Sequence, residues 1–96
     1  MNRLHSYPAP HEQVAGRVID NEAVLVMAQS GEVQVLNEVG ARIWELTDGS
    51  HSIAQIAQTI AEEFDVSPEQ ALADVGDFIS ALVGERILVL NDQPRA

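Results

Sequence analysis

The stretch Val33-Gln-Val-Leu-Asn-Glu-Val-Gly-Ala-Arg-Ile-Trp-Glu-Leu46 decides the fold, because its pattern changes from strand to helix at Asn37. Before Asn37, apolar residues alternate with a polar one, which is typical of a strand. Asn37 is a favourable helix N-cap, and Glu38 follows it in the first turn, where a negative charge suits the helix dipole. The helical stripe then consists of Val39, Ile43, Trp44 and Leu46. The sequence therefore predicts a strand over 33–36 and a short helix that ends near 48–49, with Gly49 as its C-terminal cap.

Two further strand patterns lie upstream of this segment. Residues 17–20 form a short apolar run that ends at Asn21, a residue that favours turns. Residues 23–28 are apolar on both faces, as a central strand would be. Gly31 lies in the tight connection that follows, and it is free to adopt a positive φ. Short connections between three such runs predict an antiparallel meander.

Two more helices are predicted downstream. Ser52 and Gln55 form a capping-box pattern, and an amphipathic stripe continues to Phe64. Ser67 repeats the start signal with Pro68 at the first helical position, and this third helix is expected to end near Gly84. Residues 87–90 are predicted to be a fourth strand or an extended return. The fold class is therefore α+β and winged-helix-like: a three-stranded antiparallel sheet followed by three helices, not alternating βαβ units.

The same patterns divide the chain into three parts. Residues 1–13 are expected to be a flexible N-terminal tail, because Pro8 and Pro10 disfavour a helix or a central strand there. Residues 14–90 are expected to be the single domain, and 91–96 a flexible C-terminal tail. The N-terminus lacks the apolar run of a signal peptide, and no stretch reaches the length that spans a bilayer, so the cytoplasm is the expected location.

Composition excludes several kinds of chemistry. The 96 residues include no cysteine, which excludes disulfides, thiolate metal sites and cysteine nucleophiles. His5, His11 and His51 are scattered, and none has a partner at helical metal-binding spacing. Paired acids such as Asp74 and Asp77 are better explained as a solvated helix face than as general acids. We therefore expect no catalytic residue, no metal ligand, no cofactor and no enzymatic activity.

Charge limits the partners. Fifteen Asp and Glu against five Arg give a formal net charge of −10, which opposes binding to nucleic acid or to an anionic membrane. The second and third helices resemble a helix-turn-helix, in which the second helix would enter the DNA major groove. That helix carries Glu69, Asp74 and Asp77 and no basic residue before Arg86. DNA binding is therefore not expected, whereas a neutral or basic peptide fits the charge.

The strand at Val33–Leu36 is predicted to lie at the border of the sheet. It contains no lysine or proline of the kind that protects such borders, and only Glu32 stands at its start. An extended peptide could pair with it as an added strand. The residues alone leave open whether a peptide, a second copy, the fourth strand or the N-terminal tail occupies this border.

A family resemblance favours the peptide. The string Leu36-Asn with Gly40, Ile43-Trp, Leu46 and Asp48-Gly resembles the signature of the PqqD-like family. Residues 52–57, 64–66 and 74–82 resemble the later part of that family's pattern. These small proteins recognise the leader of a ribosomally made precursor peptide. The resemblance covers about residues 14–90 and implies a winged-helix-like fold. It also implies that the leader binds along the third strand, against the third helix, and is delivered to a separate modifying enzyme.

The resemblance implies particular binding residues and partners. The peptide-binding positions are Val33, Gln34, Val35 and Leu36 on the strand and Asp74, Val75, Phe78 and Leu82 on the helix. For Val75, Phe78 and Leu82 a plain core role is the alternative. The implied partners are the leader and a peptide-modifying enzyme (a protease, a cyclase or a radical enzyme). The unprotected strand border separately leaves a homodimer open. The alternative functions are a structural or oligomerisation module and a regulator that does not bind DNA.

Overall fold

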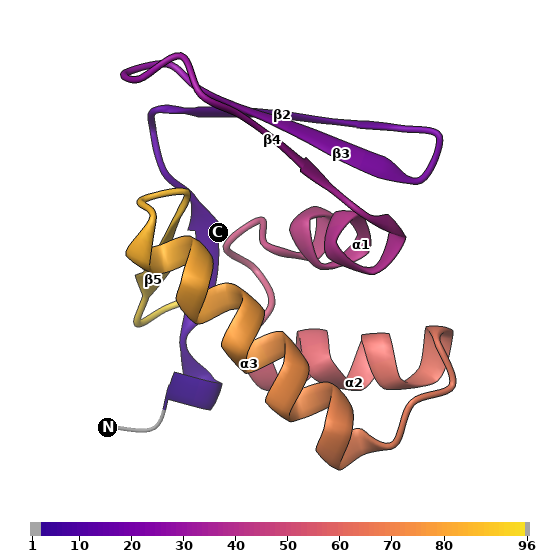
Figure 1. Cartoon of the computed structure of the whole chain (residues 1–96). Coiled ribbons are helices and arrows are strands. Elements are labelled where there is room, and N and C mark those ends of the chain that lie inside the picture. Colours follow the sequence, from indigo (N-terminus) through magenta and orange to yellow (C-terminus); the bar gives the residue numbers. More distant parts are fainter. Residues whose placement is uncertain (1–2, 96) are drawn as a thin grey trace.

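The computed structural model describes residues 3–95, and Figure 1 shows the arrangement of its elements. A single 3-10 turn and five strands combine with three helices. In chain order they are η1 (Arg3–His5), β1 (Tyr7–Pro10), β2 (Val14–Ile19), β3 (Glu22–Met27), β4 (Val33–Leu36), α1 (Glu38–Leu46), α2 (Ile53–Glu63), α3 (Pro68–Gly84) and β5 (Leu88–Asn91).

The meander predicted from the sequence is confirmed. Strands β2, β3 and β4 form an antiparallel sheet in that order, with β3 in the centre. Asp20 and Asn21 connect β2 to β3 with positive φ at both positions, as a two-residue hairpin turn requires. Gly31 has a φ of +75° in the second connection. The sheet is thus set by local turn chemistry and leaves β2 and β4 at its two borders.

All three helices lie on one side of this sheet (Figure 1). The N-caps predicted at Asn37, Ser52 and Ser67 are all present, and Ser52 with Gln55 forms the complete capping box. The apolar stripes of the helices pack against the inward side chains of β3 and β4 to form one core. The α+β class and the order of sheet and helices are therefore as predicted.

The N-terminal residues differ from the prediction. Tyr7–Pro10 was expected in a flexible tail, but it is strand β1 and pairs antiparallel with β5. The bond from the His11 N–H to the Ile87 carbonyl fixes the phase of this ladder, so the missing N–H groups of Pro8 and Pro10 fall on the side away from β5. Proline is compatible with a strand at such positions.

The C-terminal residues also pack onto the domain. Helix α1 ends at Leu46 with Thr47 as its C-cap, so Gly49 is not the cap that the sequence predicted. Gly49 instead has a φ of +86° and donates its N–H to the Pro8 carbonyl. Its carbonyl accepts from the Arg95 N–H at 2.8 Å. The expected tail over 91–96 therefore includes the last residue of β5 and a backbone contact through Arg95.

Candidate functional site

One side of β4 has unpaired backbone groups. The Met27 N–H donates to the Glu32 carbonyl at 2.9 Å, which shows that Glu32 points its backbone towards β3. Because this direction alternates along an antiparallel strand, Gln34 and Leu36 also point towards β3, whereas Val33 and Val35 point away from it. The N–H and C=O groups of Val33 and Val35 therefore form an open edge. A visiting antiparallel strand can make four hydrogen bonds to it.

The sequence left open whether this edge pairs within the chain. The two intramolecular candidates, the N-terminal segment and the fourth strand, pair with each other as β1 and β5. No strand of residues 3–95 lies on the outer side of β4. The edge is therefore available for a peptide or for a second copy.

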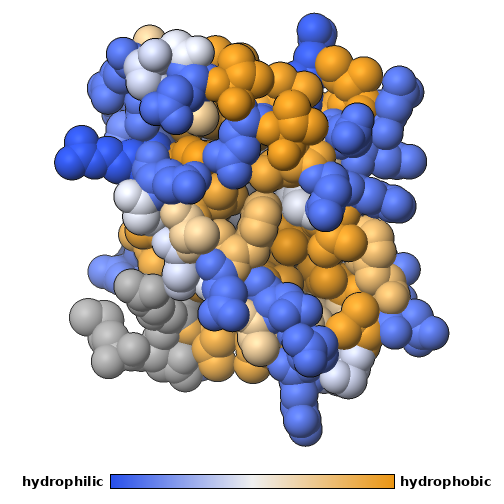
Figure 2. Space-filling model, in the orientation of Figure 1, coloured by the Kyte–Doolittle hydropathy of each residue, from blue (hydrophilic) through white to orange (hydrophobic). Residues whose placement is uncertain are grey.

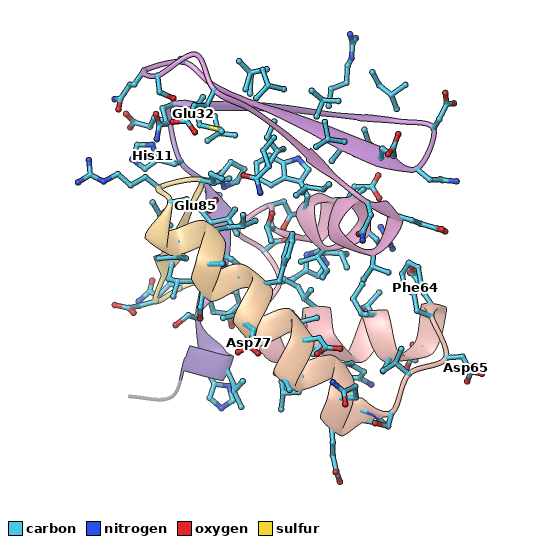
Figure 3. The ribbon with its side chains drawn as sticks, in the orientation of Figure 1. His11, Glu32, Phe64, Asp65, Asp77 and Glu85 are labelled. Carbon is cyan, nitrogen blue, oxygen red and sulfur yellow. The ribbon has the colours of Figure 1, made fainter. Side chains whose placement is uncertain are left out.

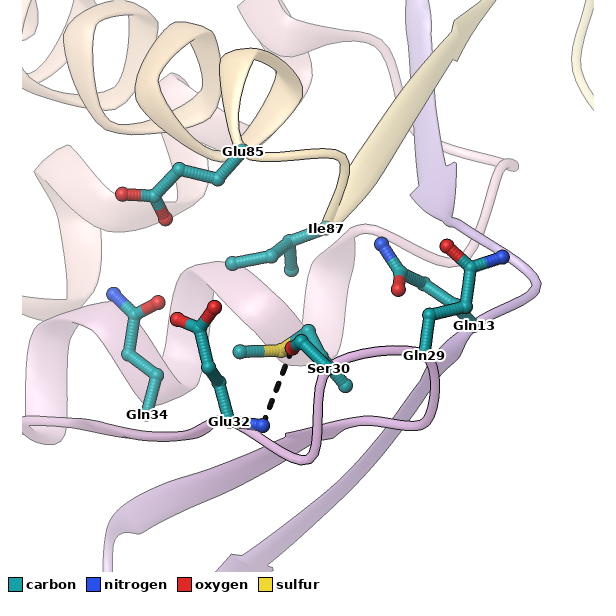
Figure 4. A pocket seen from close by; sticks show the side chains of 8 residues that line it. Gln13, Gln29, Ser30, Glu32, Gln34, Glu85 and Ile87 are labelled. Carbon is teal, nitrogen blue, oxygen red and sulfur yellow. Dashed lines mark hydrogen bonds between the residues drawn. The ribbon is translucent and has the colours of Figure 1, made fainter.

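A groove lies between this strand and the C-terminal end of α3. It has a volume of about 440 Å³ and is lined by Gln13, Met27, Gln29, Ser30, Glu32, Gln34, Glu85 and Ile87. The carboxylates of Glu32 and Glu85 extend into it from opposite sides, and Ile87 lies between them (Figure 4). The Glu32 N–H donates to Ser30 Oγ at 3.2 Å, which ties the strand start to the preceding turn. The groove is thus lined mainly by polar side chains and carries two negative charges, one on each side.

The predicted strand residues occupy two sides of the sheet. The backbone of Val33 and Val35 forms the open edge, and their side chains are 61% and 58% exposed. Gln34 is half-buried and lines the groove, whereas Leu36 is buried in the core. A peptide on the edge would therefore contact the backbone of alternate residues and, on the inner side, the side chain of Gln34.

The predicted helix residues divide in the same way. Val75 and Leu82 are 0% and 2% exposed, so their side chains belong to the core, the alternative that the sequence left open. Phe78 is half-buried, and a Cβ on Gly40 would lie 3.2 Å from its Cζ atom. Helices α1 and α3 therefore pack closely at Gly40. Asp74 is exposed and accepts a hydrogen bond from Gln70 Nε2 at 2.9 Å.

Sequence reasoning missed most residues that line the groove. Glu32 shares the inward face of β4 with Gln34, which the period of two could have indicated. Glu85 follows Phe78 by seven residues, two helical turns, and so lies on the same side of α3. Figure 3 shows Glu85 at the end of α3 nearest to Glu32, whereas Asp77 lies further down the helix. Gln13 and Ile87 come from the segments beside β1 and β5, and their approach to β4 depends on the tertiary fold.

Apolar and hydrophilic residues alternate over this side of the molecule. Figure 2 shows apolar residues between the sheet and α3, bordered by hydrophilic residues. A surface of this kind provides apolar contact area for a docked segment, while the charged border sets which segments are accepted. The carboxylates of Glu32 and Glu85 favour a neutral or basic segment over an acidic one.

A Ser–His–Asp group outside the groove does not have the geometry of a hydrolase triad. Ser50 Oγ donates to Asp48 Oδ1 at 2.6 Å, and His51 Nδ1 lies 3.1 Å from the same oxygen and 3.2 Å from the Ser50 oxygen. One imidazole nitrogen therefore faces both groups, whereas a triad uses the two nitrogens separately. The bond from Ser50 holds the pKa of Asp48 below its usual value, with a smaller effect from His51. The group stabilises the turn before α2.

Other functional classes find no support in the described chain. Within residues 3–95, no three His, Cys, Asp or Glu side chains are close enough together to hold a metal ion. In the same part of the chain, no helix has both the length and the apolar character that crossing a membrane requires.

The fold and the open edge together define the class: a small α+β domain with an unpaired strand beside a helix, suited to docking an extended segment. Residues 22–88 match the family model for coenzyme PQQ synthesis protein D (PqqD). The chain belongs to the PqqD family, which confirms the resemblance found in the sequence.

Relatives and solved structures agree with this assignment. The PqqA binding protein of Xanthomonas campestris pv. campestris is 34% identical over 65 residues, which cover 68% of this chain and 71% of the relative. The structure of TbiB1 in complex with the TbiA(β) leader peptide matches with a TM-score of 0.77 and 31% identity, covering 83% of this chain and 93% of TbiB1.

Two further structures have the same fold. Lasso peptide synthetase B1, complexed with the leader peptide, matches with a TM-score of 0.76 and 27% identity over 86% of this chain and 98% of its own. The PqqD part of Methylobacterium extorquens PqqCD, described as a stand-alone recognition element for ribosomally synthesised and modified peptides, matches with a TM-score of 0.69 and 25% identity. That match covers 85% of this chain and 87% of the PqqD part.

Proposed function

We propose that this chain binds the leader of a ribosomally made precursor peptide as an added strand along β4 and presents the precursor to a separate modifying enzyme. The observation that carries the proposal is the open edge: Val33 and Val35 direct their N–H and C=O groups away from the sheet, beside a groove that ends at α3. The leader-bound TbiB1 and lasso B1 structures, which share this fold, support it.

The energetics indicate how the leader is held. Four strand hydrogen bonds at about 1 kcal/mol each contribute roughly 4 kcal/mol. Micromolar binding requires about 8 kcal/mol, and ordering a flexible peptide costs a further 2–5 kcal/mol or more. The remainder must come from apolar side chains of the leader, at about 1.5–3 kcal/mol for each one that is fully buried. The half-buried Phe78, which lies beside Gly40 and the end of β4 at Leu36, is an apolar surface that such side chains would cover.

The domain acts without catalysis in this proposal. The Ser50–His51–Asp48 group lacks the atom arrangement of a triad. The hydroxyl oxygen of Ser30, which lines the groove, accepts a hydrogen bond from the Glu32 backbone N–H. Modification of the precursor would therefore be carried out by the partner enzyme, whether a protease, a cyclase or a radical enzyme. The cytoplasm remains the expected place for this step and is a prediction that cell fractionation would test.

The test is direct titration of candidate leaders. Short peptides encoded beside the gene for this chain would be synthesised with a fluorescent label and titrated by anisotropy, with PqqA and the TbiA(β) leader as reference probes. One neighbouring peptide should bind with a dissociation constant in the micromolar range or below. Amide NMR shifts should then concentrate at Val33 and Val35 of the labelled protein.

Proline scanning of the bound peptide separates strand addition from other modes. Each proline removes one backbone donor, so substitutions at alternate positions should weaken binding roughly 5- to 150-fold, while the intervening ones should not. Binding that survives every proline, or the absence of any neighbouring peptide that binds below about 100 µM, would contradict the proposal. A dimer whose interface covers β4 and that no peptide dissociates would favour the oligomerisation module instead.

A further inference from the structure

The side of the sheet that faces away from the helices is exposed and apolar. Residues that lie directly opposite one another on neighbouring strands form a row, and their side chains point to the same face of the sheet. The outer face consists of Ala15, Arg17, Ile19, Glu22, Val24, Val26, Val33 and Val35. Ile19 and Val26 are 51% and 40% exposed, and Val33 and Val35 are more exposed still. No helix of residues 3–95 covers this face (Figure 1).

Two opposite charges interrupt the apolar surface. Arg17 lies on β2 directly opposite Val24, and Glu22 lies on β3 in the next row of this face, opposite Ile19, so the two charges occupy diagonal positions. Neither residue forms an ion pair with another described residue, although the fifteen acids of the chain offer Arg17 many candidates. A shallow apolar depression of about 280 Å³ adjoins Arg17 and contains Ile19 and Val24 in its lining.

This arrangement is complementary to itself. In a two-fold symmetric contact, residue i of one copy meets residue j of the other, and j meets i. Consider a two-fold axis that lies in the plane of the contact and crosses the line between Arg17 and Glu22 at its midpoint, at a right angle. This axis would place each arginine opposite the glutamate of the second copy. The same axis passes close to Val24 and Val35, so these apolar side chains would meet near the centre of the contact.

We propose that a second copy of this chain docks on the outer face, with two reciprocal Arg17–Glu22 pairs flanking a contact of branched apolar side chains. Three strands and six residues span about 15 by 20 Å, or roughly 300 Å², a patch size that on monomers often marks an interaction site. Stable interfaces bury about 800 Å² from each partner, so this contact forms a weak dimer that depends on concentration. The N–H and C=O groups of Val33 and Val35 lie in the plane of the sheet, so this contact leaves them unpaired.

The test measures association of variants separately and mixed. Sedimentation velocity of the wild type should show a dimer with a dissociation constant on the order of 100 µM. In the Arg17→Glu variant the new glutamate would lie opposite Glu22 of the second copy, and in Glu22→Arg the new arginine would lie opposite Arg17. Because like charges then meet, each variant alone should dimerise at least tenfold more weakly. An equimolar mixture places opposite charges at both contacts and should restore association. A pair formed within one chain could not produce this rescue.

Charge-matched controls remove the effect of net charge. Arg86→Glu and Glu69→Arg change the net charge by the same amounts at exposed positions away from the outer face, and each should dimerise within about twofold of the wild type. Circular dichroism should show all four variants folded, and Arg17→Glu should bind a leader as tightly as the wild type does.

Several outcomes would overturn the dimer. The wild type could stay monomeric at 1 mM, or the mixture of variants could fail to associate. The control variants could also lose as much dimer affinity as Arg17→Glu and Glu22→Arg do. A modifying enzyme that protects Val24 and Val26 from hydrogen exchange, while the free protein stays monomeric, would assign the face to that enzyme and refute the dimer. Leader titration is measured separately, so failure of the dimer leaves the proposed function intact.

Discussion

Proline at two adjacent positions of β4 should have opposite effects. The N–H of Val35 points out to the open edge, whereas the N–H of Gln34 points towards Leu25 within the sheet. Val35→Pro therefore removes a donor that the fold does not use, at a border position where proline is tolerated. Gln34→Pro removes a ladder bond and leaves the Leu25 carbonyl without its partner.

The magnitudes follow from the hydrogen bonds involved. Val35→Pro loses one strand bond to the visiting peptide, and its ring displaces the neighbouring one, for a total of about 1–3 kcal/mol. Leader binding should weaken roughly 5- to 150-fold. Gln34→Pro should instead lower the free energy of unfolding by about 1–3 kcal/mol, because a backbone acceptor loses its partner.

Two assays on the same pair of variants separate the effect on leader affinity from the effect on stability. Urea unfolding followed by circular dichroism gives the stability, and anisotropy of a labelled leader gives the affinity. Val35→Pro should be folded and deficient in binding, and Gln34→Pro should be destabilised. A folded Val35→Pro that binds as tightly as the wild type would refute strand addition along β4. An unfolded Val35→Pro beside a stable Gln34→Pro would show that the assigned phase of the ladder is wrong.

Three other substitutions test particular contacts. Asp74→Arg should leave the fold intact, because its partner Gln70 is exposed, and should weaken a neutral or basic leader about two- to fivefold by titration; unfolding would instead make Asp74 a structural residue. Gly16→Val should destabilise the fold by about 1–3 kcal/mol and shift the fluorescence of Trp44, because a Cβ at Gly16 would lie 2.6 Å from its ring; an unchanged spectrum would contradict this packing. Arg42 donates to both carboxylate oxygens of Glu63 at 2.8 Å and holds the pKa of Glu63 below its usual value, so this pair stabilises the fold above that value and the effect disappears as the pH falls through the lowered pKa. Since the two side chains are 35% and 40% exposed, Arg42→Ala should cost under about 1 kcal/mol at pH 7 and nothing at pH 2 in urea titrations; an equal cost at both would exclude the ion pair as its cause.

Local signals in the sequence were enough for most of the fold. The N-caps at Asn37, Ser52 and Ser67 and the turn at Asn21 act within a few residues of the chain, so their chemistry can be read from neighbours. The strand at Val33–Leu36 is identical in sequence analysis and structure. The N-terminal strand was missed because a proline count does not reveal which side of a strand each N–H faces. That side depends on the register with β5, more than 70 residues away.

The candidate site was predictable only in part. Period-two alternation and the family resemblance identified β4, and helical spacing placed Val75 and Leu82 on α3 without showing that they are buried. The groove wall at Gln13, Glu85 and Ile87 depends on how distant segments pack.

The sequence by itself determined the helices, the meander and the family, because capping, turn chemistry and periodicity act between near neighbours. Only the tertiary structure decided that the outer edge of β4 is left unpaired. Strands β1 and β5 form their backbone hydrogen bonds with each other, so neither of these two segments pairs with β4. Strand pairing is a competition among all edges of the molecule, and its outcome depends on backbone directions that no local pattern contains.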